Sequence, residues 1–295
     1  ELHVIYLDIH KAYDSIQHDI LFQIMKGYNF PDKFIELIKK IYTNAQTCIS
    51  IKGHKSKKFR MISGIKQGCP LSCLLFNIYI NPMIDLISIQ HKGYEINKVN
   101  IPILGYVDDC ILISESGEEI QAMLNTCYQA LNKLQLKLSI RGNNKTVYTT
   151  NADYSNIISI KTDKEEILKP ILYSHETYKY LGLYTNLKNS NSEEVFNKEK
   201  AKIAFFFSML KNSACNPEQL IIVYNKIIIP GIIYKTNFID PPKDFVYWVT
   251  ENMRKLIYFK IRGNKWNSIN NLIDSESKFS WDMIDLKNYI KAARV

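Results

Sequence analysis

This sequence lacks paired, metal-binding cysteines. Its six cysteines are scattered, none belongs to a C-x-x-C pair, and no histidine pattern stands near them. The scatter excludes the common zinc motifs. It favours reduced, buried thiols in an intracellular protein, with nucleus and cytoplasm both left open.

Also missing is an apolar run long enough to cross a bilayer. The longest run, Leu220 to Tyr234, is interrupted by Asn225, Lys226 and Pro230, whereas a spanning helix needs about 20 apolar residues. We therefore expect no membrane partner. The sequence also has no start methionine and no targeting segment, and its first residues read as a strand, so we expect an excerpt of a longer protein.

Arginine is scarce, with only five among 38 basic residues. The net charge is nevertheless +9, with a pI near 9.0, and a phosphate-binding protein carries such an excess. An AT-biased genome would also produce a sequence this rich in Lys, Ile, Asn and Tyr. The charge alone therefore gives mild support for a nucleic-acid partner.

What is present is a pair of adjacent carboxylates, Asp108 and Asp109, between two apolar, β-branched runs. Such runs read as strands, which places both carboxylates at the tip of a tight hairpin. Two charges beside buried strands are costly unless they are compensated, and a hard cation such as Mg²⁺ binds carboxylate oxygens. A solvated turn is the alternative, because Asp is a common turn residue.

A third carboxylate favours the metal site over the solvated turn. Val4 to Ile9 is another short apolar run, and it carries Asp8 near its end. A strand placed beside the hairpin would bring Asp8 to the same point. Three carboxylates around two divalent ions are the usual arrangement for in-line phosphoryl displacement.

The most specific motif is Gly-Ile-Lys-Gln-Gly-Cys-Pro-Leu-Ser at residues 64–72, followed by Leu-Leu-Phe-Asn-Ile at 74–78. Its glycines allow close approach to a ligand, and the helix behind them presents its N-terminus. With Lys-Ala-Tyr-Asp at 11–14 and Tyr-Val-Asp-Asp at 106–109, in this order, the motif resembles the palm of reverse transcriptases, above all those of non-LTR (LINE-type) retrotransposons. The resemblance covers residues 1 to about 240.

This resemblance implies RNA-directed DNA synthesis from an RNA template, a DNA primer or target, and dNTPs. Asp8, Asp108 and Asp109 would face two Mg²⁺ ions, with Mn²⁺ as a substitute, and Asp109 would play the lesser part because strand neighbours point oppositely. Tyr13 would stack under the deoxyribose and exclude a 2′-hydroxyl. Gln67 and Gly68 would contact the templating base and the incoming nucleotide.

Two later segments also match the resembled family. Residues 136–139 and 144–146 resemble a motif whose lysine, here Lys145, approaches the triphosphate and would assist the leaving pyrophosphate. Residues 178–183 resemble the primer-grip hairpin, in which Tyr180, Leu181 and Gly182 would hold the primer 3′ end. Without the resemblance this segment reads as an ordinary strand with a glycine bulge.

The predicted fold is α+β. It comprises a polymerase palm, with an antiparallel sheet packed by helices on one side, partial fingers, and a helical thumb. Residues 71–89 and 118–134 have the composition of packing helices. Residues 47–51 and 57–62 read as a two-stranded basic arm that either lies along a template or is simply solvated. We expect palm and partial fingers in residues 1–175, primer grip and thumb in 176–240, and a helical extension of unassigned role in 241–295.

Three alternatives stay open. An RNA-directed RNA polymerase shares the palm, but it typically has a second Asp where this sequence has Tyr13. A group II intron or telomerase enzyme is the second alternative, although Cys-Pro-Leu-Ser at 69–72 points away from the intron type. The third is an inactive retroelement remnant that at most binds nucleic acid. Val107 and Cys73 depart from the family's usual Ala and Pro, but both residues are small.

Where the chain opens bears on its activity. In the resembled family, most of the fingers precede the first catalytic Asp, which is Asp8 here. We therefore expect this chain alone to polymerise poorly or not at all. The oligomeric state is left open.

Overall fold

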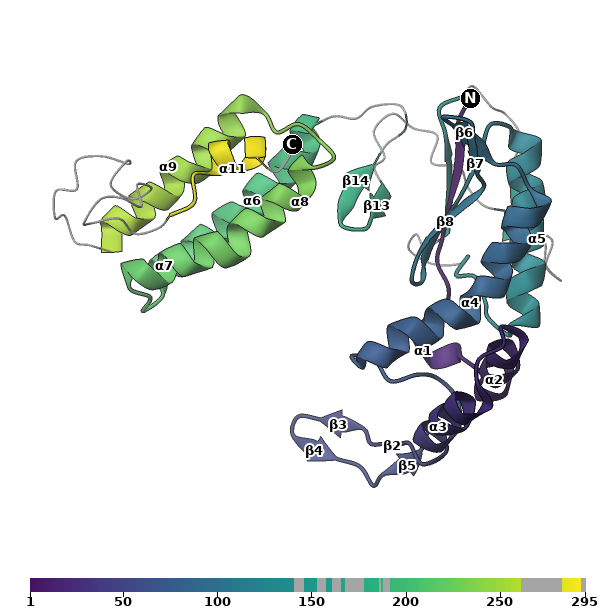
Figure 1. The fold of residues 1–295 in the computed structure, drawn as a ribbon. Helices are drawn as coiled ribbons and strands as arrows, with labels where there is room; N and C mark the ends of the chain where they lie inside the picture. Colours follow the sequence, from purple (N-terminus) through teal and green to yellow (C-terminus); the bar gives the residue numbers. More distant parts are fainter. Residues whose placement is uncertain are drawn as a thin grey trace. The chain divides into compact units, whose positions relative to one another are not determined.

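The protein is described by a computed structural model over residues 1–140, 146–152, 158–160, 166–167, 178–185, 187, 192–260 and 283–292. The chain forms two compact units, Glu1–Leu181 with Asn186–Lys188, and Gly182–Thr185 with Asn189–Val295. Each unit has its own buried apolar core. Figure 1 shows the elements of both.

A four-stranded antiparallel sheet forms the centre of the first unit. Its order is β10-β1-β9-β8, with bounds Val147–Thr150, His3–Leu7, Asp109–Ser114 and Ile103–Tyr106. Strand β1 pairs with β9 from His3↔Ser114 to Leu7↔Cys110, and β8 pairs with β9 up to Tyr106↔Asp109. The predicted hairpin and the strand beside it are therefore confirmed.

Two long helices, α4 (Pro70–Gln90) and α5 (Gly117–Lys133), cover one face of this sheet (Figure 1). Side chains alternate along a strand, and Ile5 and Leu7 of β1 enter the same core as the buried positions of both helices. Helix α5 begins where the Ser116 hydroxyl accepts a hydrogen bond from the Glu119 N–H at 3.2 Å, a standard N-cap. The predicted α+β architecture is confirmed.

Helix α4 is, by length and composition alone, apolar enough to cross a membrane, with a mean hydropathy of 1.4. Its position in the core explains that composition, because its buried residues include Leu75, Phe76, Ile80, Met83 and Ile87. The buried Tyr79 hydroxyl donates to the Leu134 carbonyl at 2.7 Å and accepts from the Gln17 N–H at 3.3 Å. Helix α4 thereby ties together segments distant in sequence.

Tyrosines cover the other face of strand β1. Tyr6 of β1 stacks on Tyr178 with ring centroids 4.4 Å apart, and its ring lies 5.3 Å from that of Tyr180. Both partners belong to strand β13 (Tyr178–Tyr180). All five residues of β1 are consequently buried, because both faces of this strand are covered.

Short helices and a β-arm follow the first strand. They are α1 (Ala12–Ser15), α2 (His18–Gly27), α3 (Asp32–Thr43), β2 (Gln46–Thr47), β3 (Ser50–Ile51), β4 (His54–Lys55) and β5 (Phe59–Arg60). Strand β2 pairs with β5, and β3 with β4, so the predicted two-stranded arm is confirmed. A second hairpin, β6 (Tyr94–Ile96) and β7 (Val99–Ile101), was not predicted.

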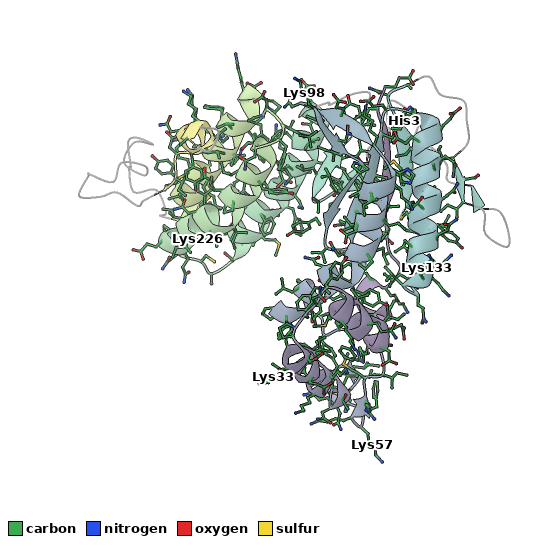
Figure 2. The ribbon with its side chains drawn as sticks, turned by 45° about the vertical axis from the view of Figure 1, so that its right-hand side comes forward. His3, Lys33, Lys57, Lys98, Lys133 and Lys226 are labelled. Carbon is green, nitrogen blue, oxygen red and sulfur yellow. The ribbon has the colours of Figure 1, made fainter. Side chains whose placement is uncertain are left out.

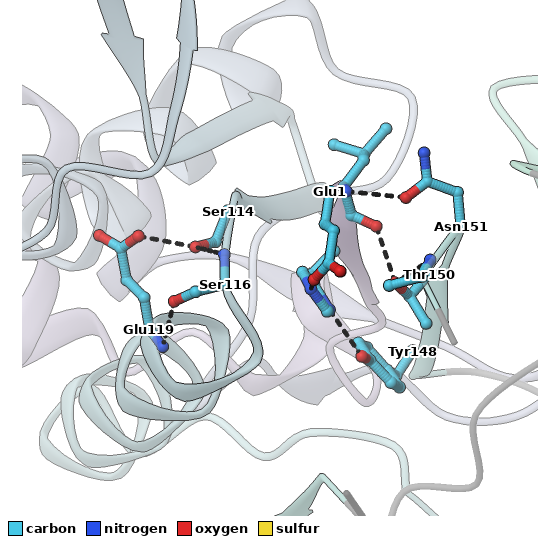
Figure 3. A network of polar contacts seen from close by, with 10 residues as sticks. Glu1, Ser114, Ser116, Glu119, Tyr148, Thr150 and Asn151 are labelled. Atoms are coloured by element: carbon cyan, nitrogen blue, oxygen red, sulfur yellow. Dashed lines mark hydrogen bonds and ion pairs between the residues drawn. The ribbon is translucent and has the colours of Figure 1, made fainter. Parts of the chain in front are cut away.

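Polar contacts fix the end of the sheet opposite the hairpin turn (Figure 3). The Ser114 hydroxyl donates to Glu119 at 2.7 Å, and the other oxygen of Glu119 accepts from the backbone N–H groups of Lys92 and Gly93 at 2.9 and 3.0 Å. On β10, the Thr150 hydroxyl donates to the Leu2 carbonyl at 3.0 Å. These bonds hold the loops around the strand ends.

Within its described residues, the second unit is helical apart from β14 (Leu183–Thr185). Its described helices are α6 (Ser192–Asn212), α7 (Pro217–Val223), a π-helical segment (Tyr224–Ile228), α8 (Ile229–Thr236), α9 (Lys243–Lys260) and α11 (Leu286–Ala292). Lys235 and Glu199 form a largely buried ion pair at 2.7 Å between α8 and α6. Helices α9 and α11 contribute Val249, Met253 and Leu286 to the core that α6–α8 also form, so described parts of 241–295 share this core.

Candidate active site

The three predicted carboxylates meet at one end of the central sheet. Asp8 follows Leu7, the last paired residue of β1, and Asp109 precedes Cys110, its partner on β9. Asp108 occupies the two-residue turn with Val107, whose φ of 59° is left-handed and unusual for a β-branched residue. Since Leu7 and Cys110 point into the core, alternation directs Asp8 and Asp109 to the opposite face, where the tyrosines lie.

Burial and mutual repulsion both act on the carboxylates of this cluster. Burial, and then the negative charges of Asp108 and Asp8, raise the pKa of Asp109 above its usual value of 3.8. Burial and the negative charges of Asp108 and Asp109 raise the pKa of the Cys110 thiol to about 12. The negative charges of Asp8 and Asp108 therefore act on Asp109 in addition to its burial.

Residues that follow the hairpin in sequence hold the backbone of Asp8 in place. Its N–H donates to the Thr146 hydroxyl at 3.2 Å, and its carbonyl accepts from the Ser139 N–H at 2.8 Å. Thr146 immediately follows Lys145, which lies outside the described residues. The segment that resembles the family's lysine motif thus contacts the backbone of Asp8 through Ser139 and Thr146. The sequence did not predict this contact.

A pocket of about 340 Å³ lies beside Tyr13, and its lining includes Gln67, Gly68, Cys69 and Cys73. The three predicted nucleotide-contacting residues are therefore brought together. The Tyr13 ring stacks on Phe76 at 5.3 Å and an interplanar angle of 7°, and its hydroxyl donates to the Cys73 sulfur at 3.3 Å. Burial, the bond to Cys73 and the charge of Asp108 raise the pKa of Tyr13 to about 12, so this side chain is a neutral donor near neutral pH.

Gly64 explains why the glycine-rich loop sits against the first motif. Its N–H donates to the Ile16 carbonyl at 2.8 Å, and the next N–H, of Ile65, donates to the Tyr13 carbonyl at 2.9 Å. Gly64 has φ +82°, and a Cβ there would stand 3.1 Å from the Asp14 Cα. Only glycine fits both the conformation and the approach, and the resulting bonds hold Gln67 and Gly68 near Tyr13.

The predicted primer-grip residues form a tight turn. Leu181 and Gly182, with φ of 45° and 82°, link β13 to β14. The Tyr180 hydroxyl donates to the Asp109 carbonyl at 3.3 Å. Burial and the charges of Asp8 and Asp109 raise the pKa of Tyr178 to about 12. Strand β13 therefore lies directly against the acidic end of the sheet.

The donor chemistry of the cluster suits a hard divalent cation. Three carboxylates, of which Asp109 has a pKa raised by burial and then by its two acidic neighbours, supply oxygen ligands and a charge that a cation would neutralise. In the part of the chain that the structure describes, no three acidic, histidine or cysteine side chains already stand at metal-ligating positions. Side-chain rotation about a fixed backbone would have to complete the ligand set.

Comparison with known proteins identifies the family. The model described as "Reverse transcriptase (RNA-dependent DNA polymerase)" matches residues 1–185. The chain belongs to the reverse transcriptase family. This match spans the sheet, all three carboxylates, the glycine-rich loop and β13, and it confirms the predicted family.

Curated relatives of this reverse transcriptase chain come from non-LTR retrotransposons. The Pol polyprotein of element R2 from Nasonia vitripennis is 25% identical over 240 residues, which cover 79% of this chain and 22% of the relative. The RNA-directed DNA polymerase from mobile element jockey of Drosophila melanogaster is 22% identical over 198 residues, covering 66% and 21%. The chain thus spans about a fifth of the length of these relatives.

Solved structures include telomerase from Candida tropicalis in complex with a fragment of telomeric RNA. It has a TM-score of 0.48 and 14% identity, and covers 99% of this chain and 46% of that one. The C-terminally truncated apo telomerase of the same organism has a TM-score of 0.42 and 16% identity, with coverage of 63% and 34%.

Proposed function

We propose that this chain carries the catalytic palm of an RNA-directed DNA polymerase of a non-LTR retrotransposon, which transfers nucleotides to a primer 3′-hydroxyl. The observation that supports this most directly is that Asp8, Asp108 and Asp109 lie at one end of the sheet. The charge of Asp108 also contributes to the raised pKa of Tyr13. Its proposed partners are an RNA template, a DNA primer or target, and dNTPs.

The carboxylates would hold divalent ions, Mg²⁺ or Mn²⁺. When bound, such ions activate the attacking hydroxyl and stabilise the leaving pyrophosphate. The chain's own contribution is positional: the sheet fixes the backbone of Asp8 and Asp109, and the turn fixes Asp108. Lys145 is proposed to approach the triphosphate on the family resemblance alone, because it lies outside the described residues.

Tyr13, Gln67 and Gly68 are proposed to receive the incoming nucleotide. The ring of Tyr13 is held flat on Phe76, and a flat aromatic ring under C2′ leaves no room for a hydroxyl. Gly68 has φ +82° with open space beside it, so a base or sugar can approach the backbone there. These features support deoxynucleotide selection and speak against the RNA-directed RNA polymerase alternative.

Tyr180, Leu181 and Gly182 are proposed to support the primer 3′ end. The support for this is the bond from the Tyr180 hydroxyl to the Asp109 carbonyl, which sets the turn next to the proposed metal ligands. A primer terminus resting on this turn would have its 3′-hydroxyl near the carboxylates, as in-line attack requires.

Single-nucleotide incorporation tests the proposal. RNA and DNA templates with one DNA primer are offered to residues 1–295 and to a longer protein that includes upstream sequence, each with Asp108→Asn as control. We expect RNA-templated, Mg²⁺-dependent incorporation by the longer protein and little by the short chain. Equal activity of the two would place the fingers within 1–295. No activity in either, with intact folding, would favour the inactive-remnant alternative.

A further inference from the structure

The positive charge of this chain is concentrated in one stretch. Residues 37–84 contain no Asp or Glu but eight basic residues, namely Lys39, Lys40, Lys52, Lys55, Lys57, Lys58, Arg60 and Lys66. Since the whole chain has 38 basic and 29 acidic residues, all other positions together carry 30 and 29. This stretch therefore supplies almost the entire net charge.

Five of these cations lie on the β-arm, defined as residues 46–60. Every residue from 51 to 60 is exposed. Its four lysines form no ion pair with any residue of the described ranges. Because no described acidic side chain neutralises these lysines, their charge is available to a binding partner.

The β-arm presents its charge in an ordered way. Cross-strand partners share a face, and the pairs Ser50↔Lys55 and Gln46↔Arg60 therefore place Lys55 and Arg60 on one face. Ile51, paired with His54, lies on the other.

The strand of the β-arm that carries Lys57 and Lys58 has one residue more than the strand opposite. Thr47 pairs with Phe59, whereas Ile49 bonds to Ser56 at 2.9 Å, so Lys57 and Lys58 both oppose Cys48. Two residues opposite one form a β-bulge, which bends the strand and redirects side chains. In Figure 2, Lys57 projects at the end of the unit away from Lys98.

We propose that the β-arm binds the phosphodiester backbone of a nucleic acid strand. The chain belongs to a family that copies nucleic acid, and the arm offers several unpaired cations without one acidic side chain to repel phosphates. Lysine side chains act on phosphates as point charges and release condensed counterions. The proposal does not require catalysis, because an inactive chain would retain this surface.

The test compares two fourfold lysine-to-glutamine variants of residues 1–295. One changes Lys52, Lys55, Lys57 and Lys58. The matched control changes Lys26, Lys33, Lys98 and Lys133, which are also exposed and have no ion pair with a described residue. Arg60 is kept in both, because its Nε–H donates to the Thr43 carbonyl at 3.0 Å and anchors the arm. A third variant replaces the four arm lysines with arginine.

Binding of labelled single-stranded RNA, single-stranded DNA and duplex is measured over a series of KCl concentrations. The slope of log K against log salt should shrink in the arm variant by about 0.7 per phosphate contact for single strands and about 0.9 for B-form duplex. Affinity should fall at least about tenfold if three or four contacts are lost. The control and the arginine variant should keep the parent slope. The three probes show which strand type the arm contacts.

Equal losses in the arm and control variants would overturn the proposal, because binding would then follow total charge. An unchanged slope in the arm variant would overturn it too. Binding to anionic phosphatidylserine vesicles that depends on the arm more strongly than nucleic-acid binding does would identify a lipid surface instead. Unfolding transitions of all variants should coincide, since the substituted lysines are exposed in both the arm and the control variant.

Discussion

The hydroxyl of Tyr13 reaches across 60 residues of sequence to the sulfur of Cys73, to which it donates a hydrogen bond at 3.3 Å. Phe76, on the same helix, supports the flat side of the ring. Helix α4 therefore fixes the ring at its face and at its tip. Cys73 stands where the resembled family usually has proline, and proline has no sulfur to accept this bond.

Replacing Tyr13 with Val should admit ribonucleotides while the fold stays intact, because the smaller side chain opens space under the sugar. Cys73→Ala should lower dNTP preference only partly, by about fivefold, since one hydrogen bond is worth about 1 kcal/mol. Competition between dNTP and rNTP on one primer measures both effects.

Tyr13→Phe is the matched control for the Cys73 anchor. It keeps the ring and removes the hydroxyl, so it should behave like Cys73→Ala. An unchanged preference in Tyr13→Val would reduce Tyr13 to a packing residue.

Asp8→Asn or Asp108→Asn should lower the incorporation rate at least ~10²-fold, because charge neutralisation and positioning supply most phosphoryl-transfer catalysis. Asp109→Asn should cost less, because the family resemblance gives the second of the two hairpin carboxylates the lesser part. Rates are compared at saturating Mg²⁺ in a protein with activity. A near-normal rate for Asp8→Asn would refute the metal assignment.

The raised pKa of Asp109 has a consequence for stability without metal. Its folded pKa lies above the unfolded value near 3.8, so its contribution is fully present below that pH and is lost as pH rises through the folded pKa. At neutral pH the ionised cluster therefore costs stability. Mg²⁺ should raise the melting temperature of the parent more than that of Asp109→Asn, with Na⁺ at equal ionic strength as the control. Identical shifts in both proteins would contradict this.

Glu119, unlike Asp109, should stabilise the first unit at neutral pH and lose this contribution in acid. Burial alone would raise its pKa, but the Ser114 hydroxyl and the N–H groups of Gly93 and Lys92 lower it below 4.5. Its contribution is therefore present above about pH 4.5 and is lost as pH falls through the folded value. Glu119→Gln should cost about 1–3 kcal/mol at pH 7, and less at pH 4. Urea unfolding measures this, with the exposed Glu118→Gln expected to change little.

Gly64→Ala should destabilise the protein more than Gly68→Ala. Both glycines have φ +82°, but only Gly64 faces backbone atoms, those of Tyr13 and Asp14 at 3.1–3.2 Å. A left-handed alanine costs about 1–2 kcal/mol, and the clash should bring Gly64→Ala to about 2–4 kcal/mol. Chemical denaturation gives the comparison. Equal losses would mean that the loop moves away from the first motif without penalty.

Local sequence signals were sufficient for the centre of the first unit. The apolar runs around Asp8 and Asp108 specify β1, β8 and β9, and the helical spacing from Ile120 to Leu131 specifies α5. Carboxylates at strand ends then had to meet once β1 lay beside β9. The glycine at position 64 was placed in a turn, and the structure adds its close contact with Asp14.

Contacts between distant residues could not be predicted in this way. Nothing near Tyr178 in sequence reveals that its ring stacks on Tyr6, and the bond from the Asp8 N–H to the Thr146 hydroxyl depends on how the later strand is placed. The hairpin of β6 and β7 was missed because its turn is Asn97–Lys98, both with positive φ, rather than the familiar Asn-Gly pair. The departure of Cys73 from the family pattern was the one signal that could have revealed its role.

The π-helical segment in the second unit limits how this part of the gene can change in length. Its defining bond runs from the Ile229 N–H to the Tyr224 carbonyl, which accommodates one residue more than an α-helical turn would. Deleting a single codon there would remove the extra residue and close an ordinary α-helical turn, with the buried Ile229 and Ile232 kept in place, whereas inserting one further residue would rotate α8 by about 100°. A one-residue deletion at the exposed Ile227 should therefore be tolerated where a one-residue insertion is not.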